Sequence, residues 1–116
     1  MIELVLLDYL KTKFDIPVVM EEINEDEYIK IQKTGSSINE RIPSSSFAIQ
    51  CYSTSLYNAA LLNEELKKVL LGDGGDYMGI AELKEVNKCS LNSDYEYTDT
   101  TTKKYRYQAT FDLNHY

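Results

Sequence analysis

The chain has 116 residues, of which 43% are hydrophobic and 27% are charged, as expected for one globular domain. Its formal net charge of -7 opposes attraction to nucleic-acid phosphates, which argues against a dedicated nucleic-acid-binding protein. No run approaches the roughly 18 apolar residues that a membrane-spanning helix needs, so no membrane partner is expected.

Residues 2–13 are expected to form an amphipathic helix, because their apolar side chains recur at helical spacing. That stripe consists of Ile2, Val5, Leu6, Tyr9 and Leu10. Glu3 and Asp8 interrupt the apolar run and no basic segment precedes it, so a signal peptide is not expected. The helix should end before Pro17, and a short extended segment should follow before an acidic turn over residues 21–27.

Two stretches, residues 27–34 and 46–53, alternate with a period of two, which predicts half-buried strands. The side chains expected on their core faces are Ile29, Ile31, Phe47, Ile49 and Cys51. Gly35 is expected to end the first strand. The serine-rich residues 35–46 between the strands carry a glycine and a proline but no helical stripe, so they predict a loop or a ragged hairpin.

A second helix is expected to run from about residue 56 to residue 71, with Thr54 or Ser55 as its N-cap. Apolar residues again recur at helical spacing, and the sequence GDGGD from Gly72 should end the helix. The next stretch, from Ile80 to Leu91, has a mixed pattern that we interpret as a strand.

The last strand is predicted over residues 104–114, which alternate most regularly. Its core face should carry Tyr105, Tyr107, Ala109, Phe111 and Leu113. Lys104 and Arg106 then point the other way, which separates the basic groups from the tyrosines. Because a stacking platform for bases needs both on one exposed face, the pattern favours a core strand, with residues 92–102 as its polar approach.

Candidates for chemistry are few, and no catalytic residue, metal ligand or cofactor is predicted. The only histidine, His115, is the penultimate residue, where chain ends usually fray. Asp73 and Asp76 lack the ligand spacing of an EF-hand. Cys51 and Cys89 have no CxxC spacing and are expected to be buried reduced thiols in a cytosolic protein. The chain is therefore not expected to be an enzyme.

Two long segments, FAIQCYSTSLYNAALLNEELKKVLLG and LNSDYEYTDTTTKKYRYQATFDLNHY, together with the opening MIELVLLDYLKTKFDIPVVMEE and the middle YIKIQKTGSS, carry a resemblance. The chain resembles the tail-terminator, or tail-completion, proteins of long-tailed bacteriophages and prophages. The resemblance covers nearly the whole chain. It implies an α+β fold, in which a mainly antiparallel twisted sheet of about four to five strands has two helices packed on one face.

The resemblance also implies a structural role in the virion tail, after assembly in the bacterial cytoplasm. Six copies would form a ring at the head-proximal end of the tail tube, where the ring ends tube polymerisation. The implied partners are other copies of the chain, the tail-tube protein and the head-tail connector. No sequence-specific binding of nucleic acid is expected, and the negative net charge would let the lumen of such a ring repel the DNA backbone and pass it without sticking.

Apolar or arginine and tyrosine side chains in segments expected at the periphery are our candidates for the subunit interface. They are Ile38, Arg41, Ile42, Tyr95 and Tyr97. Packing of these segments onto their own domain is the alternative. Two other functions also stay open: a head-to-tail connector or stopper component, and a small nucleic-acid-binding regulator that uses the last strand.

Overall fold

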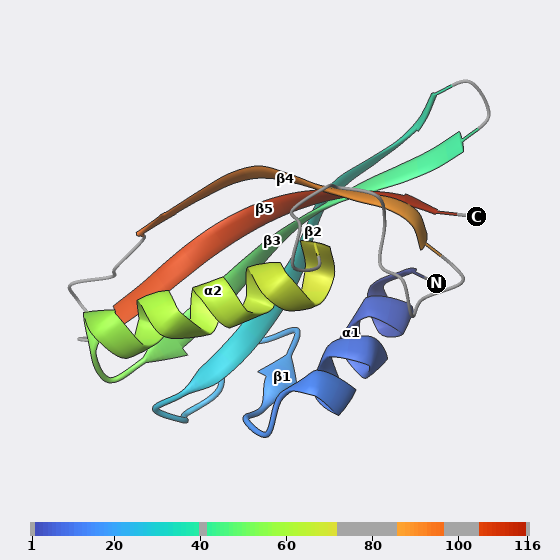
Figure 1. The fold of residues 1–116 in the computed structure, drawn as a ribbon. Helices are drawn as coiled ribbons and strands as arrows, with labels where there is room; N and C mark the ends of the chain where they lie inside the picture. Colours follow the sequence, from blue (N-terminus) through green and yellow to red (C-terminus); the bar gives the residue numbers. More distant parts are fainter. Residues whose placement is uncertain (1, 40–41, 72–85, 97–104, 116) are drawn as a thin grey trace.

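Five strands form one mixed sheet, and both helices pack on the same face of it (Figure 1). The structure is a computed structural model that describes residues 2–39, 42–71, 86–96 and 105–115. In chain order the elements are α1 (Ile2–Lys13), β1 (Val18–Val19), β2 (Tyr28–Asn39), β3 (Ile42–Ser53), α2 (Leu56–Leu71), β4 (Val86–Glu96) and β5 (Tyr105–His115). This architecture confirms the predicted α+β class and the placement of both helices.

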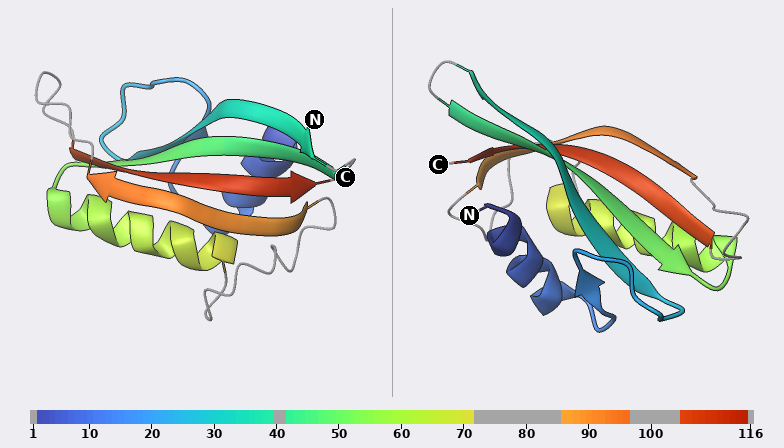
Figure 2. Two further views of the ribbon diagram at one scale, coloured as in Figure 1. Left: turned by 90° about the horizontal axis from the view of Figure 1, so that it is seen from above. Right: turned by 180° about the vertical axis from the view of Figure 1, so that it is seen from behind.

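The strand order across the sheet is β1-β2-β3-β5-β4. Only β1 and β2 run parallel, whereas the pairs β2–β3, β3–β5 and β4–β5 are antiparallel. The sheet is therefore mainly antiparallel, with the short β1 at one edge and the long β4 at the other. Seen from above, the sheet lies in front of α1 (Figure 2, left).

The helices begin and end where local chemistry predicts. The Ser55 hydroxyl accepts a hydrogen bond from the backbone N–H of Asn58 at 3.1 Å, which confirms Ser55 as the N-cap of α2. In α1, the fully or nearly buried residues Ile2, Leu6 and Leu10 recur every four positions, so one stripe faces the sheet. Among the described residues, neither helix is long and apolar enough to cross a membrane.

One apolar core fills the space between the helices and the sheet. Phe47, Ile49 and Cys51 of β3 lie opposite Phe111, Ala109 and Tyr107 of β5 in the antiparallel register, and all but Tyr107 are at most 1% exposed. Burying one such side chain contributes on the order of 2 kcal/mol, so these central rows dominate the stability of the domain. The predicted core face of β3 is confirmed, and that of β5 is confirmed for Ala109, Phe111 and Leu113.

The serine-rich segment corrects one prediction. Gly35 does not end the strand, because β2 continues to Asn39 and pairs with a β3 that already begins at Ile42. The loop alternative is wrong and the ragged hairpin is right, since a register shift lies between Lys33 and Gly35. Backbone pairing extends the ladder through the serines, where the sequence has no regular apolar alternation. The hairpin projects beyond the helices (Figure 1).

Two further expectations are corrected near the last strand. Residues 92–96, predicted as part of a polar approach to the last strand, belong to β4, whereas residues 72–85 and 97–104 lie outside the described residues. Tyr105 is 40% exposed and is not a core residue, and Tyr107 is only half-buried. Tyr105 pairs with Ser53 in the last row of the sheet that the structure describes.

Candidate assembly surfaces

The face of the sheet turned away from the helices is the first candidate surface. Alternation along β3 places Ala48, Gln50 and Tyr52 on this open face, yet these side chains are only 5%, 6% and 3% exposed. The polar atoms of Gln50 and Tyr52 are hydrogen-bonded, as buried polar groups require.

A chain of hydrogen bonds crosses three strands of the open face. Arg106 of β5 donates to the Tyr52 hydroxyl at 2.8 Å, and that hydroxyl donates to Gln50 Oε1 at 2.9 Å. Gln50 Nε2 donates to Gln108 Oε1 at 2.8 Å, and Gln108 Nε2 donates to the Tyr95 hydroxyl of β4 at 2.7 Å. Three of these four bonds join neighbouring strands, and the bond from Tyr52 to Gln50 lies within β3, so the network fixes β3, β5 and β4 relative to one another.

An aromatic stack extends the network to β2. The rings of Tyr28 and Tyr52 lie with centroids 4.4 Å apart and planes 9° from parallel. The Arg106 guanidinium carbon lies 5.6 Å from the centre of the Tyr52 ring, within the range of a cation–π contact. Burial, the neighbouring Tyr52 and the charge of Glu22 raise the pKa of Tyr28 to about 12.

Short polar side chains complete the open face. Ser46 donates to Asp112 at 2.6 Å, and the hydroxyls of Ser93 and Thr110 lie 2.8 Å apart. Lys30, at the margin near the acidic turn, lies 3.9 Å from Glu22. Amides and hydroxyls predominate in the middle of the face, where Lys30 lies beside Gln50 on β2 and Arg106 and Asp112 lie towards the two ends of β5. Depletion of charge is a feature of the centres of protein interfaces.

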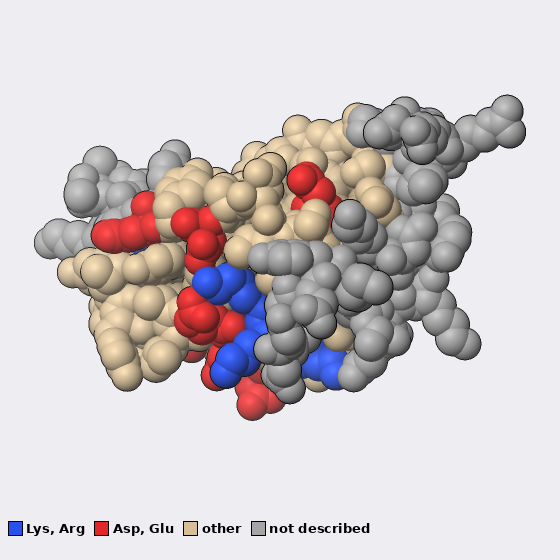
Figure 3. All heavy atoms as spheres, turned by 45° about the horizontal axis from the view of Figure 1, so that its top comes forward, with Lys and Arg blue, Asp and Glu red and all other residues tan. Residues whose placement is uncertain are grey.

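Charged side chains gather instead where α2 meets β4. Lys67 lies 2.8 Å from Asp94 of β4 and 2.7 Å from Glu64 one turn earlier. Burial alone would lower the pKa of Lys67, but hydrogen bonds to both carboxylates outweigh it and the pKa is raised. Acidic and basic side chains lie side by side in one band beside a broad uncharged surface (Figure 3).

A buried amide lies under this charged band. Asn63 of α2 is 1% exposed and donates to Asp94 at 3.2 Å. Its Oδ1 has no hydrogen-bond partner among the described residues. The carboxylate of Asp94 therefore receives bonds from both Asn63 and Lys67, which ties α2 to the edge strand.

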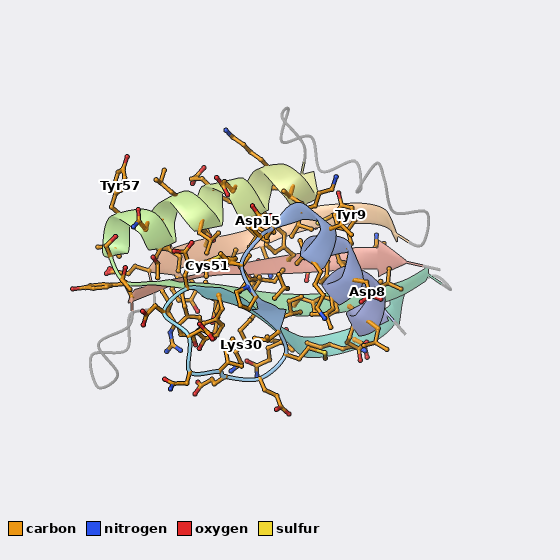
Figure 4. The ribbon with its side chains drawn as sticks, turned by 90° about the horizontal axis from the view of Figure 1, so that it is seen from below. Asp8, Tyr9, Asp15, Lys30, Cys51 and Tyr57 are labelled. Carbon is orange, nitrogen blue, oxygen red and sulfur yellow. The ribbon has the colours of Figure 1, made fainter. Side chains whose placement is uncertain are left out.

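The start of α2 carries an exposed apolar patch. Leu56, Tyr57 and Leu61 are 38%, 73% and 47% exposed, and Tyr57 points away from the rest of the molecule (Figure 4). Although Leu56 and Leu61 are apolar, the side chains that α2 buries are Ala59, Leu62, Asn63, Leu66 and Leu70.

The groups with potential for chemistry are held apart or buried. Both cysteines are free and buried, as predicted. Burial raises the pKa of Cys51, and burial together with the charge of Asp112 raises that of Cys89 to about 12, so both are protonated at neutral pH. Within the described ranges, no group of three His, Cys, Asp or Glu side chains is placed to hold a metal ion.

The structure does not bring the predicted interface residues together. The backbones of Ile38 and Ile42 lie in the projecting hairpin, whereas Tyr95 lies on β4 in the row that crosses Gln108 and Gln50. Tyr95 is 44% exposed and its hydroxyl accepts from Gln108. Arg41 and Tyr97 lie outside the described residues. The predicted residues whose backbones are described thus occupy opposite ends of the sheet.

Sequence reasoning missed the Tyr28–Tyr52–Arg106 group. Alternation placed each of these side chains on the face away from the core, but it did not indicate which strands are neighbours. The pairing of β3 with β5 sets Arg106 directly opposite Tyr52. Tyrosines at outward positions of two consecutive strands were the available signal.

Comparison of the chain with protein-family models gives no match, and comparison with curated proteins gives none either.

Proposed function

We propose that the chain is a structural protein of a phage or prophage tail. Copies of it form a ring at the head-proximal end of the tail tube, and this ring ends tube polymerisation and presents a surface to the head. The proposal starts from the resemblance of the sequence to tail terminators. The α+β fold with both helices on one face agrees with what that resemblance implies.

The observation that carries the proposal is the open face of the sheet. Its central side chains, Ala48, Gln50, Gln108, Thr110 and Ser93, are uncharged, and Lys30 on β2 is the charged neighbour of Gln50 in the same row, although the chain carries a net charge of -7. A rigid, uncharged, hydrogen-bonded surface loses few charge–water contacts when another protein covers it. Such a surface is suited to assembly.

The nucleic-acid alternative receives no support from the basic residue that the structure describes on the last strand. Arg106 is half-buried and donates to Tyr52, whose ring is itself 3% exposed. A stacking platform needs accessible aromatic faces, and the ring beside Arg106 is covered. Gel-shift measurements at low salt are expected to show no binding to either single- or double-stranded DNA.

Deletion of the gene from the virus that encodes it, followed by electron microscopy, tests the proposed function. A terminator is indicated by tails that are longer than in the parent virus and lack heads. Filled heads without tails would instead indicate a connector, and normal virions would contradict both roles. Expression of the protein in trans should restore tails of parental length.

A further inference from the structure

The outer sides of β2 and β4, at the two edges of the sheet, both have backbone with no strand beside it among the described residues. Among the described residues, β1 pairs only with Ile29 and Lys30 of β2, so the rest of that edge has no strand beside it. At the opposite edge, the outer side of β4 has no partner strand in the part of the chain that the structure describes. Unpaired edges are templates for strand addition.

The backbone groups that point outward can be assigned from the pairing register. Ile29 donates its N–H to Pro17 at 2.9 Å, away from β3. Successive residues of an antiparallel strand alternate between facing the partner strand and facing away. Ile29 pairs with Cys51 of β3, so Ser45, an even number of residues away, also faces away from β2, and so does its partner Ser36.

The same argument crosses the sheet to β4. Because Ser45 faces away from β2, it exchanges hydrogen bonds with Leu113 of β5. Leu113 then faces away from β4, and its partner there, Cys89, must point outward. Ser36 and Cys89 are therefore the two ends of one row across the sheet, and both present their N–H and C=O groups to its outside.

The part of the β2 edge that β1 occupies and the acidic part of the β4 edge lie in the same rows of the sheet. The C-terminal half of β4 carries Asp94 and Glu96, and its rows lead to Ile31 and Ile29 of β2, beside β1. The other half of β4 carries Cys89, Ser90 and Leu91, and its rows end at Ser36, Gly35 and Lys33. Acidic residues discourage pairing on one half, and uncharged residues predominate on the other.

We propose that the chain joins a second copy of itself by extending the sheet. Residues 89–91 on the outer edge of β4 pair with residues 33–36 on the outer edge of β2 in the neighbour. The strand directions alternate across β2, β3, β5 and β4, so a neighbour placed in the same orientation presents its β2 antiparallel to β4. The contact is heterologous, and heterologous contacts close rings. This inference rests on the proposed function, for which it names the subunit contact.

Engineered disulfides test the register of this contact. The row next to the one that ends at Cys89 and Ser36 runs from Ser90 to Gly35, by way of Asp112 and Ser46. In the proposed contact, Ser90 faces Gly35 of the neighbour as a pair without hydrogen bonds, with Cα atoms about 4.5 Å apart, a separation that a disulfide spans. A Cβ atom at Gly35 meets nothing within 4 Å, so the substitution is tolerated.

The variant Gly35→Cys/Ser90→Cys is expected to form a ladder of cross-linked species above the dimer after mild oxidation, on a non-reducing gel. Each single variant should give dimers at most, because one engineered thiol per chain can form only one link. The matched control is Gly35→Cys/Ser93→Cys, in which the second thiol lies on the same strand beyond its register shift. This control should give no ladder. Cys51 and Cys89 are buried and should stay reduced.

Light scattering on the same variants under reducing conditions separates the two proposals. A ladder of bands that ends at a fixed highest mass, together with a large particle in light scattering, supports both the contact and the closed ring. A large particle without a ladder overturns this contact and leaves the ring. A monomer without a ladder contradicts both, and a ladder without a top band supports the contact while contradicting closure.

A second variant serves if the double substitution fails to fold. Ser36→Pro removes an outward N–H and leaves the inward hydrogen bonds between β2 and β3 in place. We expect the association constant to fall by roughly tenfold or more, because a hydrogen bond is lost and the proline ring obstructs the neighbour. Unchanged association in sedimentation velocity, with circular dichroism like that of the unmodified chain, would overturn the contact.

Discussion

On the helix-covered side of the sheet, β3 contributes Phe47, Ile49 and Cys51, and on the open side it contributes Ala48, Gln50 and Tyr52. All six are at most 6% exposed. The covered face is held by apolar burial, which has no preferred direction. The open face is held by directional hydrogen bonds from Arg106 to Tyr95, each with a defined partner.

The difference teaches that the two faces of one sheet are held by different forces. Apolar side chains need cover, and the two helices supply it. The open face, with its stacked Tyr28–Tyr52 pair, is held by its own hydrogen bonds without either helix over it, so its outer atoms remain available to another protein. The following substitutions are ways to break or sharpen this contrast.

The largest effect is expected from Phe111→Asp on the covered face. Phe111 is 1% exposed, and a buried unpaired carboxylate adds a desolvation cost to the lost packing. Loss of the ring alone costs about 3–5 kcal/mol, so the variant should not fold. Thr110→Ala on the opposite face of the same strand is the control, with an expected loss below about 1 kcal/mol. Urea denaturation that finds equal stability for the two variants would contradict the assigned faces.

A smaller loss, about 1–2 kcal/mol, is expected from Tyr52→Phe, which removes the hydroxyl between Arg106 and Gln50. The ring and its stack on Tyr28 remain, so the loss measures the network. Tyr57→Phe is the control, since Tyr57 is 73% exposed and its hydroxyl should contribute less than about 0.5 kcal/mol. If both variants unfold at the same urea concentration as the unmodified chain, the hydrogen-bond chain does not hold the open face together.

Alkaline pH should weaken the open face through Tyr28. Its pKa is raised from 10.0 to about 12 in the folded protein, so between these values the unfolded chain releases a proton that the folded protein retains. The free energy of unfolding must therefore fall as pH rises from 10 to 12. Tyr28→Phe should make this fall shallower. An identical pH dependence for the variant, measured by urea denaturation, would refute the assignment.

The smallest loss is expected at the boundary between α2 and β4. Lys67→Met breaks the ion pairs with Asp94 and Glu64, whose side chains are 31% and 61% exposed. Partly exposed pairs contribute up to about 1 kcal/mol. A double-mutant cycle with Asp94→Asn measures the coupling free energy between Lys67 and Asp94. Lys68→Met is the control. A coupling of zero would show that the band of charges does not join the helix to the edge strand.

Much of the covered face could be predicted from the sequence, because period-two alternation in β3 and β5 and helical spacing in α1 reflect burial directly. Residues 35–39 and 92–96 were harder to predict. Serines, asparagine and acidic residues there form strands through backbone pairing with β3 and β5, which leaves no apolar pattern.

The candidate surfaces were less predictable for a different reason. The network joins residues on four strands, and contacts such as Arg106 with Tyr52 span 54 positions in the chain. A single sequence gives the face of each residue but not the order of strands across the sheet. Tyr105 was assigned to the core because it alternates in step with Ala109 and Phe111. Its row, however, is the last one that the structure describes at that end of β5.

The mass of the particle that the purified chain forms tests the central claim, that this domain is a self-assembling tail part. Light scattering after size exclusion, over a range of concentrations with and without the tail-tube protein, should find a particle about six times the 13.4 kDa of the chain. The mass should stay constant as concentration rises, because a closed ring adds no further copies. A chain that remains at 13.4 kDa at every concentration, and also with the tail-tube protein, would contradict the account.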